Sequence, residues 1–229
     1  MKINTNSNTY TLVYACGVVI IVAFLLAFVS SALKEPSEAN ERIDQQKQIL
    51  ASLNIRPDKD KVEEVYKQTV VSDPIVDTTG ATIKADGGFA VKRKEIGPTN
   101  LPVYICKVDG QTKYVLPLVG KGLWGGIWGY LAVNDDCTTV FGSYFGHESE
   151  TAGLGALISG EAFQAEFKGK SLQTADGQVL SVTKYGAKKT SPTTQCDGIS
   201  GATLTTNGVT NMIHDYLKLY KNFLENAKH

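Results

Sequence analysis

The sequence predicts an α+β protein with an apolar N-terminal helix, a single domain built on a mainly antiparallel sheet, and an amphipathic C-terminal helix. Residues 11–33 form an apolar run without an ionisable side chain of the Asp, Glu, Lys, Arg or His type. Short apolar or alternating runs, separated by Gly, Asp and Pro, fill residues 90–145 and are typical of strands. Apolar residues between 209 and 224 recur at a spacing of three and four, which indicates one buried helix face.

The apolar run at 11–33 follows a short tail, residues 1–10, and is long enough for a transmembrane helix, which needs about 20 apolar residues. The small residues at 29–32 also fit a cleavable signal peptide, but the run is longer than a usual signal core. Only Lys2 precedes the run, and acidic residues are interleaved with the basic ones that follow it. Charge therefore says little about orientation.

Residues 34–72 are predicted to form a helical stalk, with helices at 37–53 and 58–70, and residues 73–229 to form the domain. Strands are expected at 90–93, 103–108, 113–118, 128–133 and 138–145. The chain of 229 residues has 23 basic and 23 acidic side chains and no basic patch with interleaved aromatics. This balance argues against nucleic-acid binding.

The segment from Asp197 to Thr205 places several hydroxyls and small residues directly before the C-terminal helix, which we expect to begin near residues 205–207. A threonine hydroxyl is a weak nucleophile, and no activating base stands beside Thr203. Thr203 is therefore expected to be presented to another enzyme. The helix N-terminus would stabilise a phosphate there. An ordinary helix cap is the alternative interpretation.

Two further segments combine glycines with other informative residues. Residues 120–130 pack glycines against aromatics, as expected where the backbone approaches a flat ligand, with Trp124, Trp128 or Tyr130 as candidates to wall it. The alternative is a turning, bulged strand pair, and the order of a Walker A loop is absent. Residues 147–155 form a glycine-containing loop. His147 and Glu148 at its start fit a solvated loop end better than a metal or acid–base pair.

The remaining candidates for chemistry are sparse. Cys16 lies in the apolar run, and Cys106, Cys137 and Cys196 match no zinc or iron–sulfur spacing, although two of them could form a disulfide. His214 lies in the C-terminal helix without a Cys or His at ligand spacing. No catalytic residues and no metal site are predicted.

These segments resemble one family when they are taken in order. D-G-I-S-G-A-T at 197–203 resembles a flavinylation motif, and E-T-A-G-L-G at 150–155 resembles the family's E-T-P-G-L-G, with Ala152 in place of proline. L-P-L-V-G-K-G-L-W-G at 116–125 and the stalk segment at 44–50 complete the match. The chain resembles the C subunits of the sodium-translocating NADH:quinone reductase, which carry an FMN-binding domain. The related G subunits of the Rnf ferredoxin:NAD complex share only the first two motifs and remain an alternative.

The resemblance implies FMN attached through a phosphoester to Thr203 by a separate flavin transferase. It implies a one-electron carrier within a multisubunit NADH:ubiquinone reductase of the translocase class, with the other subunits as partners. The location implied is the bacterial inner membrane, single-pass, with the soluble domain in the periplasm. A non-redox, membrane-tethered FMN-binding or regulatory domain is the alternative from another class. The candidate cofactor-binding residues besides Thr203 are Lys121, Gly122, Leu123, Trp124, Glu150, Thr151, Gly153, Leu154, Gly155, Asp197, Ser200, Gly201, Ala202, Leu204 and Thr205.

Overall fold

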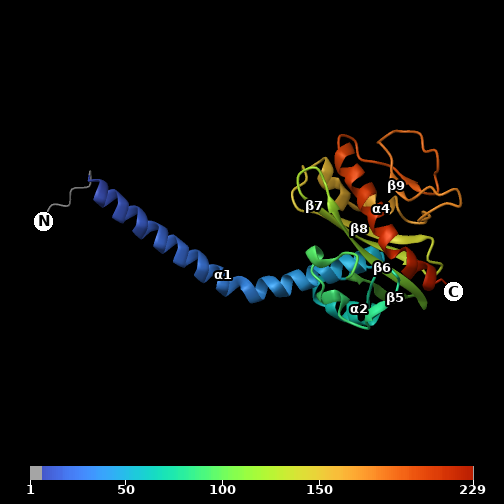
Figure 1. Cartoon of the computed structure of the whole chain (residues 1–229), viewed down its shortest axis with the longest axis horizontal. Helices are drawn as coiled ribbons and strands as arrows, with labels where there is room; N and C mark the ends of the chain where they lie inside the picture. The colour runs from blue at the N-terminus through green and yellow to red at the C-terminus, as the bar shows by residue number, and fades with distance from the viewer. Residues whose placement is uncertain (1–6, 229) are drawn as a thin grey trace. The chain divides into compact units, whose positions relative to one another are not determined.

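The computed structural model describes residues 7–228 and divides into two compact units, one ending at Gln45 and one running from Gln46 onward. The predicted α+β class is confirmed: the chain has an apolar N-terminal helix, a mainly antiparallel sheet and a C-terminal helix (Figure 1). Residues 1–6 of the expected N-terminal tail lie outside the described residues.

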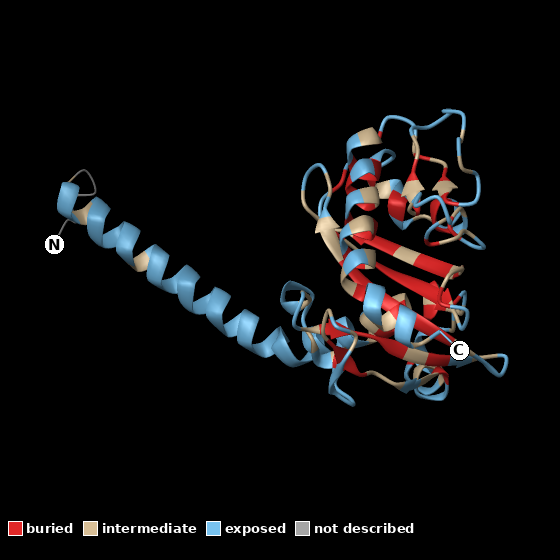
Figure 2. Cartoon of the chain, turned by 45° about the vertical axis from the view of Figure 1, so that its right-hand side comes forward, coloured by how far each residue is buried: buried red, intermediate tan, exposed pale blue. Residues whose placement is uncertain are grey.

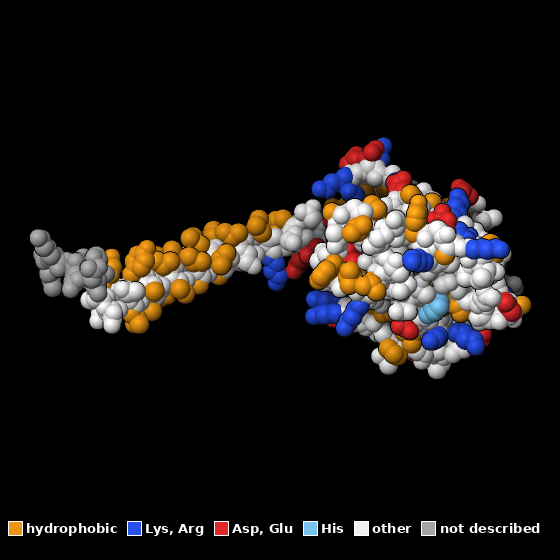
Figure 3. Space-filling model, turned by 90° about the horizontal axis from the view of Figure 1, so that it is seen from above, with side chains coloured by type: hydrophobic (Ala, Val, Ile, Leu, Met, Phe, Trp, Pro, Cys, Tyr) orange, Lys and Arg blue, Asp and Glu red, His pale blue; other side chains and the backbone are white. Residues whose placement is uncertain are grey.

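Helix α1 (Asn8–Ser52) is continuous through the expected boundary between membrane span and stalk. The hydroxyl of Ser7 accepts the amide of Tyr10 at 3.2 Å and caps its first turn. Apolar side chains cover its N-terminal part (Figure 3), where the most apolar window of 18 residues has a mean hydropathy of 3.0 and no buried residue. By length and composition, α1 is the one helix within residues 7–228 that could cross a membrane.

The last turns of α1 belong to the second unit. Ile49 and Leu53 are at most 1% exposed and pack against the sheet. The helix ends because Asn54 adopts a left-handed φ of 61°, a common helix stop, and the amide of Ile55 donates to the carbonyl of Leu50. Helix α2 (Val62–Thr69) follows a 3₁₀ turn at Lys59–Lys61. Residues 46–72, expected as stalk, therefore pack within the compact unit.

The central sheet is antiparallel throughout and has the order β1-β5-β6-β7-β8. The long hairpin of β6 and β7 is its middle, and pairing runs without a register shift from Lys113↔Asn134 to Lys121↔Gly126. Residues 120–130 therefore form the end of a strand pair and its turn, as predicted in the alternative to a ligand-binding segment. The pairing within this segment has no bulge. The bounds of the five strands are β1 Val70–Ser72, β5 Tyr104–Val108, β6 Gln111–Lys121, β7 Gly126–Asn134 and β8 Val140–His147.

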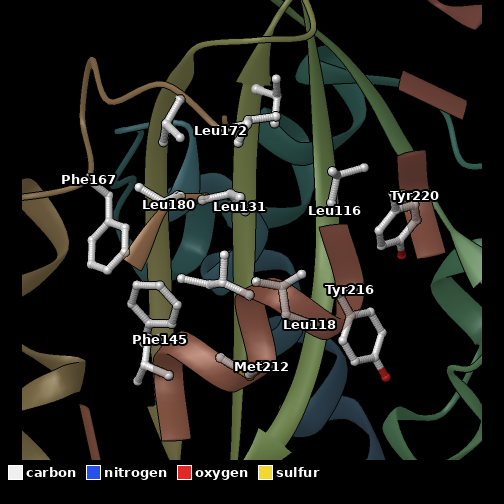
Figure 4. Close-up of a cluster of buried hydrophobic side chains, with 14 of the residues drawn as sticks. Leu116, Leu118, Leu131, Phe145, Phe167, Leu172, Leu180, Met212, Tyr216 and Tyr220 are labelled. Atoms are coloured by element: carbon white, nitrogen blue, oxygen red, sulfur yellow. The ribbon is translucent and has the colours of Figure 1, made fainter. Parts of the chain in front are cut away.

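Helix α4 (Thr203–Asn226) lies across one face of this sheet, where most of the core is found (Figures 2 and 4). Leu116, Leu118 and Leu131 of the sheet meet Met212 and Tyr216 of α4 in this cluster. Side chains alternate between the faces of a strand, so the neighbouring positions point the other way. They form a second cluster with Ile49 and Leu53, to which Tyr104, Cys106, Val115, Tyr130 and Ala132 contribute.

Smaller elements surround the central sheet. The three-stranded sheet has the order β3-β2-β4, and β9 and β10 form a short parallel pair. The bounds of these strands are β2 Ile75–Val76, β3 Thr82–Lys84, β4 Leu101–Pro102, β9 Ser181–Val182 and β10 Gln195–Cys196. The remaining helices are η2 Gly88–Ala90, η3 Arg93–Glu95, η4 Gly155–Ser159 and α3 Glu161–Ala165.

Three local predictions need correction. The strand expected at 90–93 is wrong, because the carboxylate of Asp73 accepts the amides of Phe89 (2.7 Å) and Gly87 (3.2 Å) and holds this region in 3₁₀ turns. Strand β8 begins two residues later than expected, since Asp136 accepts the amides of residues 138 and 139. Helix α4 begins at Thr203 rather than near 205–207.

Candidate functional site

Thr203 is the first residue of α4 and is half-buried. The preceding residue, Ala202, has no side chain that could cap the helix, and Gly201 turns the chain into it with a φ of 73°. Within residues 7–228, the amides of Thr203, Leu204 and Thr205 have no hydrogen-bond acceptor. The helix start therefore leaves three donors and the positive end of the dipole available for an anion.

The hydroxyls of the three threonines at this helix start differ in their surroundings. Thr205 is 1% exposed and donates to Glu150 Oε2 at 2.5 Å. Thr206, also 1% exposed, donates back to the carbonyls of Ala202 and Thr203 at 3.2 and 3.1 Å. The hydroxyl of Thr203 has no such bond to any described residue. Among the three it is the one left available for attachment.

Glu150 joins the three sequence motifs. Its Oε2 accepts from Thr205, and its Oε1 accepts the amide of Trp124 at 2.8 Å. Burial raises the pKa of Glu150, but the hydroxyl of Thr205 and the amides of the 123–125 loop outweigh burial, so the pKa lies below its ordinary value. The carboxylate is therefore ionised at neutral pH. The loops at 121–125 and 150–155 consequently lie against the start of α4.

The loop at 150–155 is a tight turn. The carbonyl of Thr151 accepts the amides of Leu154 and Ala156, both at 3.1 Å, and Gly153 has a left-handed φ of 75°. Leu154 packs against Gly201 in the 197–203 motif, because a Cβ built on Gly201 would lie 2.8 Å from Leu154 Cδ2. Gly153 and Gly201 thus let the loop at 150–155 pack against the segment at 197–203.

Four large apolar side chains are exposed on the segments that meet at the start of α4. Single exposed apolar side chains are common, and only a contiguous patch marks a binding site. Leu154 contacts Gly201, and the backbone of Trp124 is tied to Glu150. The exposed fractions are 67% for Trp124, 61% for Leu204, 47% for Leu123 and 41% for Leu154.

The other two aromatic candidates lie on the opposite face of the sheet. Tyr130 is 4% exposed and belongs to the cluster around Ile49, and Trp128 packs against the same cluster. Trp128 donates its ring N–H to Gln48 and stacks against Arg93 at 3.8 Å. Both residues lie on the face of the sheet away from α4, whereas Trp124 lies on the loop whose backbone bonds to Glu150 near the start of α4.

Asp197 is part of a charged network with Lys189 and Glu166. Its carboxylate pairs with Lys189 Nζ at 3.0 Å, and its amide donates to Glu166 Oε2 at 3.2 Å. Gly198 packs against the carbonyl of Thr183. Lys189 and Glu166 carry no motif signal in the sequence, because they reach Asp197 only through the fold.

Groups suited to metal binding or thiol chemistry are sparse. No group of three His, Cys, Asp or Glu side chains is placed for a metal among residues 7–228. The described cysteines are free, and burial raises the pKa of the Cys196 thiol to about 12. The ring of His214 contacts the carbonyl of Leu180 at 3.1 Å, a structural role, and His147 Nδ1 accepts the amide of Glu150.

A cavity of about 530 Å³ lies along the C-terminal half of α4. His214 at its near end is eleven residues beyond Thr203, roughly 16 Å at helical rise. It is therefore separate from the Thr203 site.

Comparisons with known proteins identify the domain family and the related subunits. Residues 122–218 match the model of the FMN-binding domain. The chain is 32% identical over 232 residues to the C subunit of the Na(+)-translocating NADH-quinone reductase of Haemophilus ducreyi, covering 92% of this chain and 90% of the relative. The crystal structure of the same subunit from Parabacteroides distasonis matches with a TM-score of 0.79 and 36% identity, covering 84% of this chain and 96% of that one. Shewanella oneidensis NqrC, at 22% identity and a TM-score of 0.71 over 83% and 99% of the two chains, shares the fold.

Proposed function

Because this chain belongs to the family of C subunits of the Na(+)-translocating NADH-quinone reductase, we propose that it is a membrane-anchored flavoprotein subunit whose FMN is attached to Thr203. FMN supplies one-electron transfer when it is bound, and the protein fixes its place and surroundings. The chain would relay single electrons between other subunits of a sodium-exporting complex. It would itself neither oxidise NADH nor bind quinone.

The observation that carries this proposal is the free Thr203 hydroxyl at an uncapped helix N-terminus. The amides of residues 203–205 donate to no partner among residues 7–228 and are therefore available to an anion, as helix starts are satisfied by side chains, water or ligands. A phosphoester on Thr203 would place its charge beside these donors. Thr205 and Thr206 are poor attachment points, because their hydroxyls are buried and already bonded.

The apolar surroundings suit the other end of the cofactor. An isoalloxazine ring is flat and largely apolar, and Trp124, Leu154 and Leu204 offer exposed apolar surface on segments that meet at the start of α4. Burying such surface stabilises by about 25 cal/mol per Å². These side chains would shield the ring and orient it.

Activation of the Thr203 hydroxyl must come from elsewhere. The carboxylates of the two motifs, Glu150 and Asp197, are already bonded to Thr205 and Lys189. Among the described residues, neither carboxylate bonds to the Thr203 hydroxyl. We therefore include a separate flavin transferase among the partners, with Thr203 as the acceptor that this enzyme modifies.

The apolar helix supports the proposed location. The N-terminal part of α1 has the length and hydropathy of a membrane span and no buried residue. We propose a single-pass anchor in the bacterial inner membrane, with the FMN-binding domain on the periplasmic side. The orientation rests on the family resemblance.

Co-expression with a flavin transferase followed by a denaturing gel tests the attachment. The wild-type chain should show flavin fluorescence in its band after denaturation. Thr203→Ala should lose it, whereas Thr206→Val should keep it, because that variant leaves the Thr203 hydroxyl in place. A dark wild-type band, with the transferase active on a control substrate, would favour the alternative of a non-redox tethered domain.

A further inference from the structure

The carboxylate of Glu150 is enclosed by three segments that are far apart in the sequence. It is 7% exposed and bonds to the amide of Trp124 and to the hydroxyl of Thr205. The bond to Thr205 spans 55 sequence positions and the bond to Trp124 spans 26. One side chain therefore connects the 121–125 loop, the 150–155 loop and the first turn of α4, which we call the Glu150 clamp.

The glycines of the motifs make room for this clamp. A Cβ on Gly122 would lie 2.5 Å from Glu150 Oε1, and a Cβ on Gly155 would lie 2.5 Å from both Glu150 Oε2 and Thr205 Oγ1. Real Cβ atoms do not approach so closely, so any larger residue at either position would displace the carboxylate. A Cβ on Gly208 would strike the carbonyl of Lys121, so this glycine lets α4 approach the same loop. Gly122 and Gly155 thus leave room for the carboxylate, and Gly208 leaves room for the approach of α4 to the 121–125 loop.

The hydrogen bonds of Glu150 also bear on whether its carboxylate could contact a flavin phosphate. Its two oxygens face protein donors, and both bonds belong to the charge-assisted class, which is about twice as strong as bonds between neutral groups. An ionised carboxylate repels the negatively charged phosphate of a flavin, so Glu150 is a poor phosphate contact. Its two hydrogen bonds hold the Trp124 loop and the start of α4, and these segments are the route by which it affects the cofactor in the proposal below.

We propose that Glu150 is a positioning residue, which locks the Trp124 loop onto the start of α4 and so sets the position of Trp124 relative to the group on Thr203. The part of this proposal that concerns the flavin rests on the proposed function. The clamp itself is a property of the chain without cofactor. Glu150 thus moves from the candidate cofactor contacts to the residues that support them.

The chain offers a matched pair of variants. Thr205→Val removes the hydroxyl that bonds to Glu150, while Thr206→Val removes an equally buried hydroxyl that bonds only to carbonyls at the start of α4. Thr205→Ser retains a hydroxyl at this position. Glu150→Ala removes both acceptors, and it is interpreted only if its circular dichroism and unfolding remain cooperative.

Hydrogen–deuterium exchange of the full chain without flavin, in detergent, tests the clamp directly. We expect Thr205→Val to speed exchange of amides 122–125 by about tenfold or more, the factor that corresponds to the loss of one hydrogen bond. Thr206→Val and Thr205→Ser should leave that loop as in the wild type. Unchanged exchange of 122–125 in Thr205→Val would overturn the clamp, whatever the flavin does.

The flavin-loaded chain tests the positioning role. Thr205→Val should shift the absorption spectrum and midpoint potential of the bound flavin, and Thr206→Val should not. Identical spectra and potentials in the wild type and Thr205→Val would overturn the positioning role. If the wild-type chain takes up no covalent flavin, the proposed function fails, whereas the exchange experiment still decides whether the clamp exists.

Discussion

Glu150 and Thr205 are joined by a hydrogen bond of 2.5 Å that crosses 55 sequence positions, and it fixes the start of α4 against the loop at 150–155. The donor is 1% exposed and the acceptor 7% exposed. Hydrogen bonds to charged groups in buried surroundings contribute more than average, because neither partner can turn to water.

Thr205→Val should therefore destabilise the protein by about 1.5–3 kcal/mol, the usual contribution of a hydrogen bond to a charged group. Urea unfolding followed by circular dichroism measures this loss. Thr206→Val should cost less, because a threonine hydroxyl that bonds back to its own helix contributes little. Equal losses in the two variants would contradict the special role of Thr205.

The Glu150 carboxylate should also make stability depend on pH. Its pKa lies below the ordinary 4.5, because hydrogen bonds from Thr205 and the amide of Trp124 outweigh burial, which raises it. Its contribution is therefore fully present above pH 4.5 and is lost as the pH falls through the folded-state pKa. The difference in unfolding free energy between wild type and Glu150→Gln should be largest at neutral pH. A difference that stays constant down to about pH 3 would contradict this assignment.

Substitutions at Trp124 and Trp128 should distinguish effects on the flavin environment from effects on the stability of the fold. Trp124 is 67% exposed on the loop held by Glu150, so Trp124→Ala should change the absorption and potential of the flavin with little effect on unfolding. Trp128→Phe should do the reverse, because that ring bonds to Gln48 and stacks on Arg93 on the opposite face of the sheet. Spectra and redox titrations of both flavin-loaded variants give the comparison. An unchanged flavin in Trp124→Ala would remove Trp124 from the site.

Gly155→Ala should destabilise the protein by about 1–3 kcal/mol, since its Cβ would crowd the Glu150–Thr205 bond. Gly97→Ala is the matched control. Gly97 has open space around the built Cβ and no positive φ. Thermal unfolding of both variants is the measurement, and equal melting temperatures would show that Gly155 does not enclose the carboxylate as described.

The sequence predicted the elements that show a regular pattern over many residues. The apolar spacing at 209–224 predicted α4, and the alternation at 103–145 predicted β5 to β8. Strands such as β2 and β9 are two residues long and show no alternation of their own, because their partner strands define them. The strand predicted at 90–93 was wrong for a similar reason, because a residue distant in the sequence determines the local structure. The carboxylate of Asp73 accepts the amide of Phe89, 16 positions away.

In the candidate site, too, features that are continuous in the sequence could be predicted, and features that depend on distant segments could not. Motifs that are continuous in the sequence, such as Gly201 to Thr205, could be recognised directly. The Glu150–Thr205 bond and the Lys189–Asp197 pair could not, because each depends on how distant segments meet. The start of α4 at Thr203 was missed because Ala202, which precedes it, offers no cap signal.

Peptide mapping by mass spectrometry of the full chain, co-expressed with a flavin transferase, tests covalent FMN on Thr203 most directly. Our account predicts an added FMN minus one water on the wild-type peptide that contains Thr203, with the fragment ions placing it on that residue. Thr203→Ala should yield an unmodified peptide. An unmodified wild-type peptide, from cells in which the transferase modifies a control substrate, or a modification on Thr205 or Thr206, would contradict the account.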